Sequence, residues 1–92
     1  MRRGRNQRIQ EGTDFICMYN LHSRVLEGIQ YCKRTETLLV TFKTGRVYWY
    51  EDVPQEIVRN FIEARSKGAF YNKWIKHNKD IRPAEKVIQV AT

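Results

Sequence analysis

The fold of this chain is decided by residues 38–50, which read Leu38-Leu-Val-Thr-Phe-Lys-Thr-Gly-Arg-Val-Tyr-Trp-Tyr50. Apolar side chains recur at every second position on both sides of the central Lys-Thr-Gly, which is the period of a β-strand. A two-residue turn would need a positive φ at Thr44, which is costly for a β-branched residue. A three-residue turn needs a positive φ only at Gly45. The stretch therefore predicts a β-hairpin with the loop Lys43-Thr44-Gly45.

This turn determines which side chains share a face of the sheet. With the loop at residues 43–45, Val40 lies opposite Tyr48 and Leu38 lies opposite Tyr50. One face then carries Leu38, Val40, Phe42, Tyr48 and Tyr50, and the other carries Leu39, Thr41, Val47 and Trp49. A slip of one residue would regroup both sets, so the register is a specific prediction.

Apolar segments on either side of the hairpin complete the expected fold. Residues 25–33 predict a first core strand, in which Gly28 marks a bulge or a close approach of two backbones. Residues 57–62 and 70–75 have apolar side chains at helical spacing, with Pro54 suited to the first helical position and Gly68 to the stop. The prediction is an α+β fold with a small antiparallel three-stranded meander and two short helices packed on one face. Residues 14–19 and 86–90 would make the sheet four- or five-stranded if they join it.

The net charge of +7 lies at the two ends of the chain. Residues 1–8 carry +4, residues 9–64 carry −2 and residues 65–92 carry +5. We expect a flexible basic arm over residues 1–12, one domain over 13–79, and a C-terminal tail or edge strand over 80–92. Basic flanks on a nearly neutral middle favour an anionic partner.

Several classes of protein are disfavoured by the sequence. No apolar run approaches the ~18 residues of a membrane span, and the basic N-terminus lacks the apolar segment of a signal peptide, so we expect a cytoplasmic protein. Cys17 and Cys32 form neither a CxxC nor a Cys/His metal spacing, which predicts reduced thiols and no cofactor. His22 and His77 stand outside any catalytic motif, so we do not expect an enzyme.

An ordered set of residues between Leu21 and His77 resembles a known family. The set comprises Leu21-His-Ser23, Gly28-Ile-x-Tyr31, Leu38-x-Val-x-Phe42, Gly45-x-Val-Tyr-x-Tyr50, Val53-Pro54, Ala64-x-Ser66, Gly68 and Phe70-Tyr-Asn72. Over these residues the chain is similar to the KTSC domain, which is found at the C-terminus of some lysyl-tRNA synthetases and as a small stand-alone protein in bacteria and phages. The resemblance implies a small module with no catalytic residues to carry over, and the synthetase context makes RNA a candidate partner.

Nucleic-acid binding needs cations for the phosphates and exposed aromatic faces for the bases. The candidate cations lie in the arm and along the second helix and its flanks: Arg2, Arg3, Arg5 and Arg8, then Arg65, Lys67, Lys73, Lys76, Lys79 and Arg82. Trp49 is the candidate stacking residue, because the predicted register places it on the face away from the helices. Alternatively, Trp49 packs beneath the arm, beneath the tail or in a homodimer. The favoured interpretation is a non-catalytic module that binds nucleic acid, with RNA preferred over DNA.

The alternative interpretation is a protein-interaction module. A phage or bacterial accessory protein that binds and modulates another protein could use an exposed patch of Leu39, Val47 and Trp49 as its anchor. Salt would separate the two interpretations, because phosphate binding weakens steeply as salt rises and an apolar interface changes little.

Overall fold

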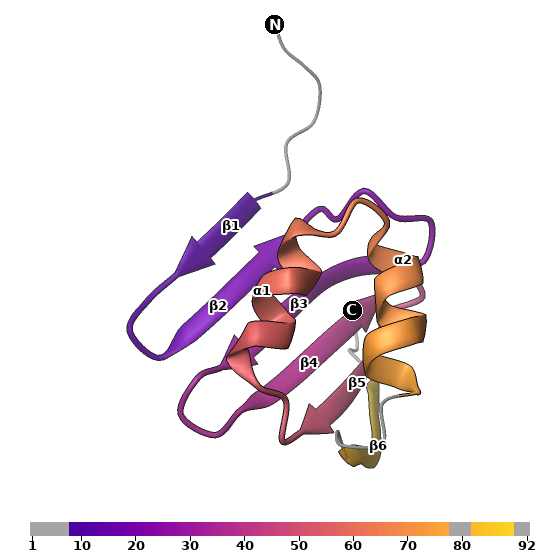
Figure 1. Cartoon of the computed structure of the whole chain (residues 1–92). Coiled ribbons are helices and arrows are strands. Elements are labelled where there is room, and N and C mark those ends of the chain that lie inside the picture. The colour runs from indigo at the N-terminus through magenta and orange to yellow at the C-terminus, as the bar shows by residue number, and fades with distance from the viewer. Residues whose placement is uncertain (1–7, 78–81, 90–92) are drawn as a thin grey trace, which may run out of the picture.

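The computed structural model describes residues 8–77 with their side chains and residues 82–89 by their backbone. The strands are β1 (Arg8–Glu11), β2 (Phe15–Tyr19), β3 (Leu26–Cys32), β4 (Thr37–Phe42), β5 (Arg46–Glu51) and β6 (Arg82–Gln89). The helices are α1 (Gln55–Glu63), α2 (Lys67–Phe70) and the π-helix η1 (Tyr71–Lys76). The six strands form one antiparallel sheet in the order of the chain (Figure 1). The α+β fold class is confirmed.

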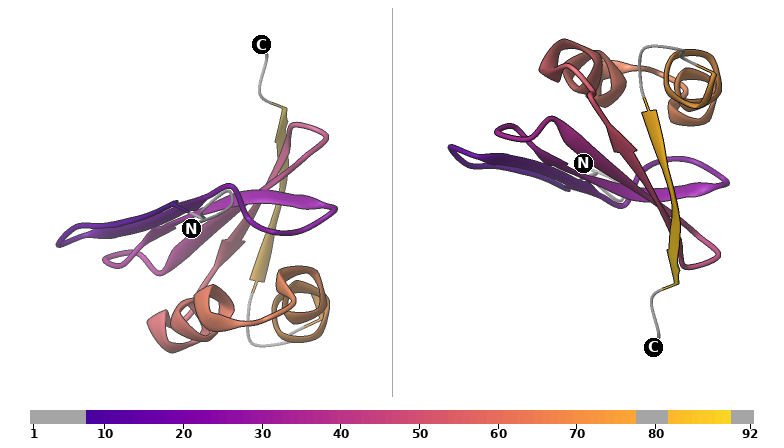
Figure 2. Two further views of the ribbon diagram at one scale, coloured as in Figure 1. Left: turned by 90° about the horizontal axis from the view of Figure 1, so that it is seen from above. Right: turned by 90° about the horizontal axis from the view of Figure 1, so that it is seen from below.

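Both helical segments cover the same face of this sheet (Figure 2). Val58 and Phe61 of α1 are buried there, as are Tyr71 and Ile75 of η1. A buried hydrogen bond of 2.6 Å from the Tyr31 hydroxyl to the Val53 carbonyl joins β3 to the segment that enters α1. In the described part of the chain, the opposite face has no helix over it, and we call it the open face.

The predicted hairpin and its register are confirmed. Leu38 pairs with Tyr50 and Val40 pairs with Tyr48. Gly45 has a φ of 95°, and its N–H donates a 2.9 Å hydrogen bond to the Phe42 carbonyl, which closes the three-residue loop. The positive φ is favourable only because Gly45 lacks a Cβ.

The sheet is wider than the hairpin alone indicates. Residues 15–19 form β2, as the alternation of apolar side chains suggested, but β2 is an inner strand because β1 pairs with its outer side. Arg8–Glu11 was expected within the flexible arm and is instead this edge strand. Residues 86–89 of the predicted strand at 86–90 belong to the longer β6, and residue 90 lies outside the described residues. Pro83 is tolerated in β6 because an edge strand has unpaired N–H positions.

The helical region differs from the prediction at Gly68. α1 ends at Glu63, Ala64 is extended with a ψ of 140°, and Gly68 lies within α2 rather than at the end of α1. The stronger local signal is Ser66, whose Oγ accepts a 3.2 Å hydrogen bond from the Ala69 N–H and caps α2. Pro54 likewise occupies the N-cap of α1, one position before the first helical residue.

Gly28 has the role predicted for it on both counts. The pairing of β3 with β4 shifts between Leu26 and Gly28, which is a bulge. A Cβ at Gly28 would lie 2.7 Å from the carbonyl oxygen of Met18 on β2, so two backbones approach closely at this point.

We predict that Gly28→Ala destabilises the fold by about 1–3 kcal/mol, because the added methyl forces β2 and β3 apart. Urea denaturation measures the change. Gly68→Ala is the matched control, because the only atom near its Cβ is the Ser23 Oγ at 3.9 Å. Removing a glycine from a helix should stabilise the control by about 0.5–1 kcal/mol. Equal stabilities for Gly28→Ala and the wild type would contradict the close approach.

Candidate nucleic-acid interface

The open face can be assigned from the pairing of the strands, because directly opposed residues point to the same side of a sheet. Arg8 is opposite Tyr19, and Phe15 is opposite Cys32. These positions alternate with Ile16 and Met18, which are buried under the helices. The open face therefore includes Arg8, Phe15, Cys17, Tyr19, Cys32 and Leu39.

Two aromatic side chains are exposed on the open face. Phe15 is 44% exposed and Tyr19 is 37% exposed. A shallow depression of about 310 Å³ lies beside Phe15 and is lined chiefly by Phe15, Cys17, Gln30, Cys32 and Leu39. The surface thus combines exposed aromatic rings with an apolar floor, which suits the stacking of a flat group.

Hydrogen bonds shift the pKa values of two groups on the open face. Hydrogen bonding with Cys17 raises the pKa of the Tyr19 hydroxyl, so the phenol is neutral at physiological pH. Hydrogen bonds from Thr35 lower the pKa of the Cys32 thiol. Cys17 and Cys32 are both free thiols, as predicted.

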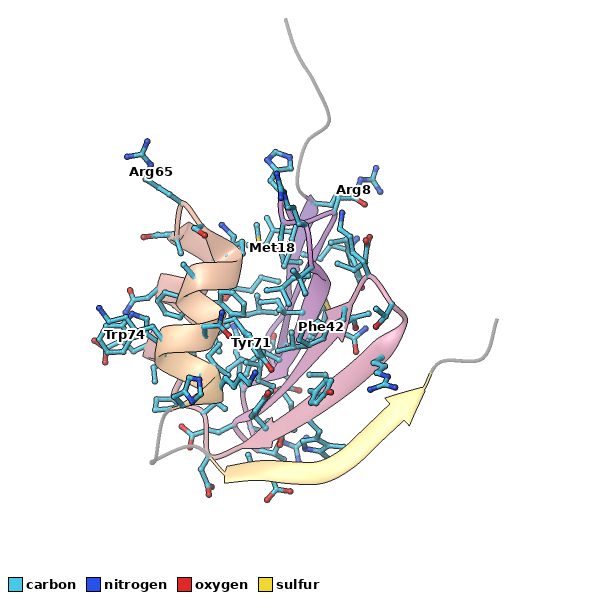
Figure 3. All side chains as sticks on the ribbon, turned by 90° about the vertical axis from the view of Figure 1, so that its right-hand side faces the viewer. Arg8, Met18, Phe42, Arg65, Tyr71 and Trp74 are labelled. Carbon is cyan, nitrogen blue, oxygen red and sulfur yellow. The ribbon has the colours of Figure 1, made fainter. Side chains whose placement is uncertain are left out.

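The edge strand β1 contributes a cation to the open face. Arg8 extends to the side away from the helices (Figure 3). The segment that contains Arg2, Arg3 and Arg5 lies outside the described residues and joins the fold directly before Arg8. Arg8 therefore places a positive charge on the open face, beside Tyr19.

Glu11 forms ion pairs that connect β1 with α1 and with Lys33. Its carboxylate accepts hydrogen bonds of 2.9 and 2.5 Å from the Arg59 guanidinium on α1. The Lys33 Nζ lies 2.7 Å from the same carboxylate. These two cations lower the pKa of Glu11 from 4.5 to about 2, with the Arg59 hydrogen bond as the largest cause.

We predict that the docking of β1 depends on pH. The stabilisation by Glu11 is complete above pH 4.5, its ordinary pKa, and is lost as the pH falls towards about 2, because only the ionised carboxylate binds both cations. An NMR titration of the Glu11 carboxyl measures its pKa, and amide exchange in β1 reports the docking. Glu11→Gln should exchange faster in β1 already at neutral pH. A normal pKa for Glu11 would contradict the prediction.

Trp49 is less accessible than a stacking residue needs to be. It lies on the open side of the sheet opposite Leu39, as the register predicted, but it is only partly exposed. Its Nε1 is buried and has no hydrogen-bond partner among the described residues. Val47 on the same face is buried, so the patch of Leu39, Val47 and Trp49 considered as a protein anchor is largely covered.

The predicted cations of the helical region do not share a surface with Trp49. Arg65, Lys73 and Lys76 are exposed on the helical side, and Figure 3 shows Arg65 pointing away from the sheet. Lys67 is buried, its Nζ donates a 2.5 Å hydrogen bond to the Ala64 carbonyl, and burial lowers its pKa. Lys79 and the side chain of Arg82 lie outside the described residues.

Sequence reasoning therefore missed the two aromatic residues that the open face exposes. The signal was the alternation of Phe15, Cys17 and Tyr19, but the intervening Ile16 and Met18 are also apolar and obscured which set was buried. The pairing with β3 resolves this ambiguity.

The described residues show neither a metal site nor a membrane span. They contain no group of three or more His, Cys, Asp or Glu side chains placed to hold a metal ion. Among them there is also no helix with the length and apolar character needed to cross a membrane.

Two known proteins are similar in sequence to part of this chain. A stretch of 52 residues, 56% of this chain, is 38% identical to a lysine–tRNA ligase of Nostoc punctiforme and spans 9% of that protein. A stretch of 56 residues, 61% of this chain, is 38% identical to an uncharacterized protein of Stutzerimonas stutzeri and spans 79% of it.

The fold is also found among solved structures. The crystal structure of a KTSC domain protein from Yersinia pestis matches with a TM-score of 0.63 over 94% of this chain and 100% of that chain, at 22% identity. The KTSC domain, which is not a known enzyme family, matches residues 22–78. This chain therefore belongs to the KTSC domain family.

Proposed function

We propose that this KTSC domain is a non-catalytic module that binds single-stranded nucleic acid, RNA in preference to DNA, on the open face of its sheet. The observation that carries the proposal is the exposure of Phe15 and Tyr19 on a sheet face without a helix, beside Arg8. Sheets of this kind recognise RNA by stacking unpaired bases on aromatic side chains.

The spacing of the two rings supports contact with more than one base. Phe15 and Tyr19 are four residues apart on β2, which is about 13 Å along a strand. The depression beside Phe15 offers an apolar surface of Cys17, Cys32 and Leu39. A duplex hides its bases, so a single strand fits this surface better.

The distribution of charge supports phosphate contacts at one end of the face. Arg8 lies opposite Tyr19 on the edge strand. The preceding segment adds Arg2, Arg3 and Arg5. If all four bind phosphates, the logarithm of the affinity should fall with the logarithm of salt with a slope of about −3. A preference for RNA is supported by the similarity to part of a protein named as a lysine–tRNA ligase.

We predict that Phe15→Ala with Tyr19→Ala weakens binding to single-stranded RNA by about 30-fold or more, because each of the two lost stacking contacts is worth ~1–3 kcal/mol. Fluorescence anisotropy with a labelled oligonucleotide measures the affinity. Arg65→Glu with Lys73→Glu is the control for charge on the helical side and should change the affinity far less. The proposal fails if the aromatic variant binds as the wild type does, or if only the helical variant loses affinity.

Arg8→Ala should weaken binding of all RNA sequences equally and reduce the salt slope by about 0.7, because one phosphate contact is lost. The same titration repeated at two salt concentrations gives the slope. Lys43→Ala is a matched control, since Lys43 lies in the β4–β5 loop at an exposed position. An unchanged salt slope for Arg8→Ala would show that Arg8 does not contact a phosphate in the interface.

A protein-interaction module is the second candidate, supported by a different surface. Ile57, Phe70 and Trp74 line an apolar groove of about 390 Å³ on the helical side, and Figure 3 shows Trp74 on the side of the helix away from the sheet. The Trp74 ring lies 6.2 Å from Phe70, and the Lys73 Nζ lies 5.3 Å from it. Binding through this groove would be insensitive to salt and to the Phe15 and Tyr19 substitutions.

A further inference from the structure

A pair of buried phenols lies between the sheet and η1. Tyr50 is 4% exposed and Tyr71 is 6% exposed, and their hydroxyl groups are hydrogen-bonded to each other. Such a bond uses one of the two hydroxyl hydrogens and leaves the other as a donor. Both side chains line a cavity, into which the remaining hydroxyl hydrogen can donate. This hydrogen favours an oxygen atom as its acceptor in the cavity.

Both phenols are donors at physiological pH. Burial raises the pKa of Tyr50 and raises that of Tyr71 further, where the hydrogen bond with Tyr50 adds to the effect of burial. Neutral hydroxyls favour an acceptor that carries negative charge.

The phenol pair faces a cavity of about 290 Å³. η1 contributes Asn72 and Lys76 to its lining, which adds an amide and an ammonium as donors. None of the lining residues whose side chains the structure describes is acidic. Phe42 and Tyr48 contribute aromatic walls, with ring centroids 5.2 Å apart. The cavity therefore brings polar donors and aromatic rings together, with the exposed Asn72 and Lys76 among its lining residues.

The helix that supplies these donors has an uncommon geometry. Tyr71–Lys76 is a π-helix, a form that is rare and is often found at functional sites. Tyr71, Asn72 and Lys76 all line the cavity, while Ile75 of the same helix is buried in the core.

We infer that this cavity binds a nucleoside monophosphate. The Tyr50–Tyr71 pair, Asn72 and Lys76 supply hydrogen bonds and positive charge for the phosphate, and Phe42 and Tyr48 supply faces for the base. The volume is near the lower limit of ~300–1,000 Å³ for ligand sites, which suits one nucleotide rather than several. The site lies on the helical side of the sheet, so it is separate from the open face and does not depend on RNA binding there.

The test is an NMR titration of the full chain, ¹⁵N-labelled, with AMP, UMP, inorganic phosphate and uridine. We expect saturable shifts of the amides of residues 48–50 and 71–76 with both nucleotides, weaker shifts with phosphate and none with uridine. A 5′-phosphorylated and a 5′-hydroxyl RNA trinucleotide distinguish the source of the ligand. If the phosphorylated trinucleotide binds more tightly than AMP and UMP do, the site is assigned to RNA ends. If it binds as tightly as these nucleotides or more weakly, the site is assigned to free nucleotides.

Three variants make the test specific. Tyr71→Phe keeps the ring and removes one hydroxyl, and Lys76→Met keeps the length and removes the charge. Each should raise the Kd for AMP about 10- to 100-fold, because a hydrogen bond to a charged group is lost. Gly68→Ala adds a methyl to a residue that lines the cavity, without a clash, and should weaken binding while the protein stays folded.

Lys73→Met is the control, because it removes an exposed cation from the same helix but not from the cavity lining. It should bind AMP as the wild type does, and so should the double variant at Phe15 and Tyr19. Thermal unfolding verifies that every variant is folded. Two results would overturn the inference: no saturable shift with AMP, UMP or the phosphorylated trinucleotide at millimolar concentration, or unchanged affinity in folded Tyr71→Phe and Lys76→Met.

Discussion

The pairing register of β4 with β5 governs how this small domain divides its residues between two surfaces. Gly45 closes a three-residue loop with a positive φ, and this loop sets Leu38 opposite Tyr50. Because side chains alternate along a strand, Tyr48 and Tyr50 then face the helices and Trp49 faces the other way. In this register the Tyr50 hydroxyl reaches Tyr71 on η1 and is hydrogen-bonded to its hydroxyl.

Local physics made the centre of the fold predictable from the sequence. The hairpin register follows from the positive φ of Gly45, which a residue with a Cβ rarely adopts. The role of Gly28 follows from its missing side chain. The edges were less predictable, because an edge strand such as β1 is exposed and lacks a clear apolar alternation. Its position depends on the ion pairs of Glu11 with Lys33 and Arg59, the latter 48 residues away in the sequence.

The candidate site was harder to predict than the fold, because exposure is set by distant parts of the chain. Trp49 was placed on the correct face, yet its indole N–H is buried. Lys67 appeared to be one more surface cation, yet the turn between α1 and α2 folds it onto the Ala64 carbonyl. The π-helical form of residues 71–76 has no recognisable signature in the sequence, and it brings Asn72 and Lys76 to the tyrosine pair.

The two faces of the sheet therefore have different chemical character. The open face has exposed aromatic rings and one edge arginine, which suits unpaired bases. The helical side has buried phenols and a cavity with polar donors. These surfaces are separated by the sheet, so the helical lysines and the open-face aromatic residues are on opposite sides of the domain.

The open face as the RNA surface is best examined by mapping amide shifts of the ¹⁵N-labelled chain during a titration with single-stranded RNA. Our account predicts shifts concentrated in β1, β2 and the facing part of β3, with α1 nearly unchanged, and a loss of these shifts at high salt. Shifts confined to α1, α2 and η1, or no shifts at all in low salt, would contradict it.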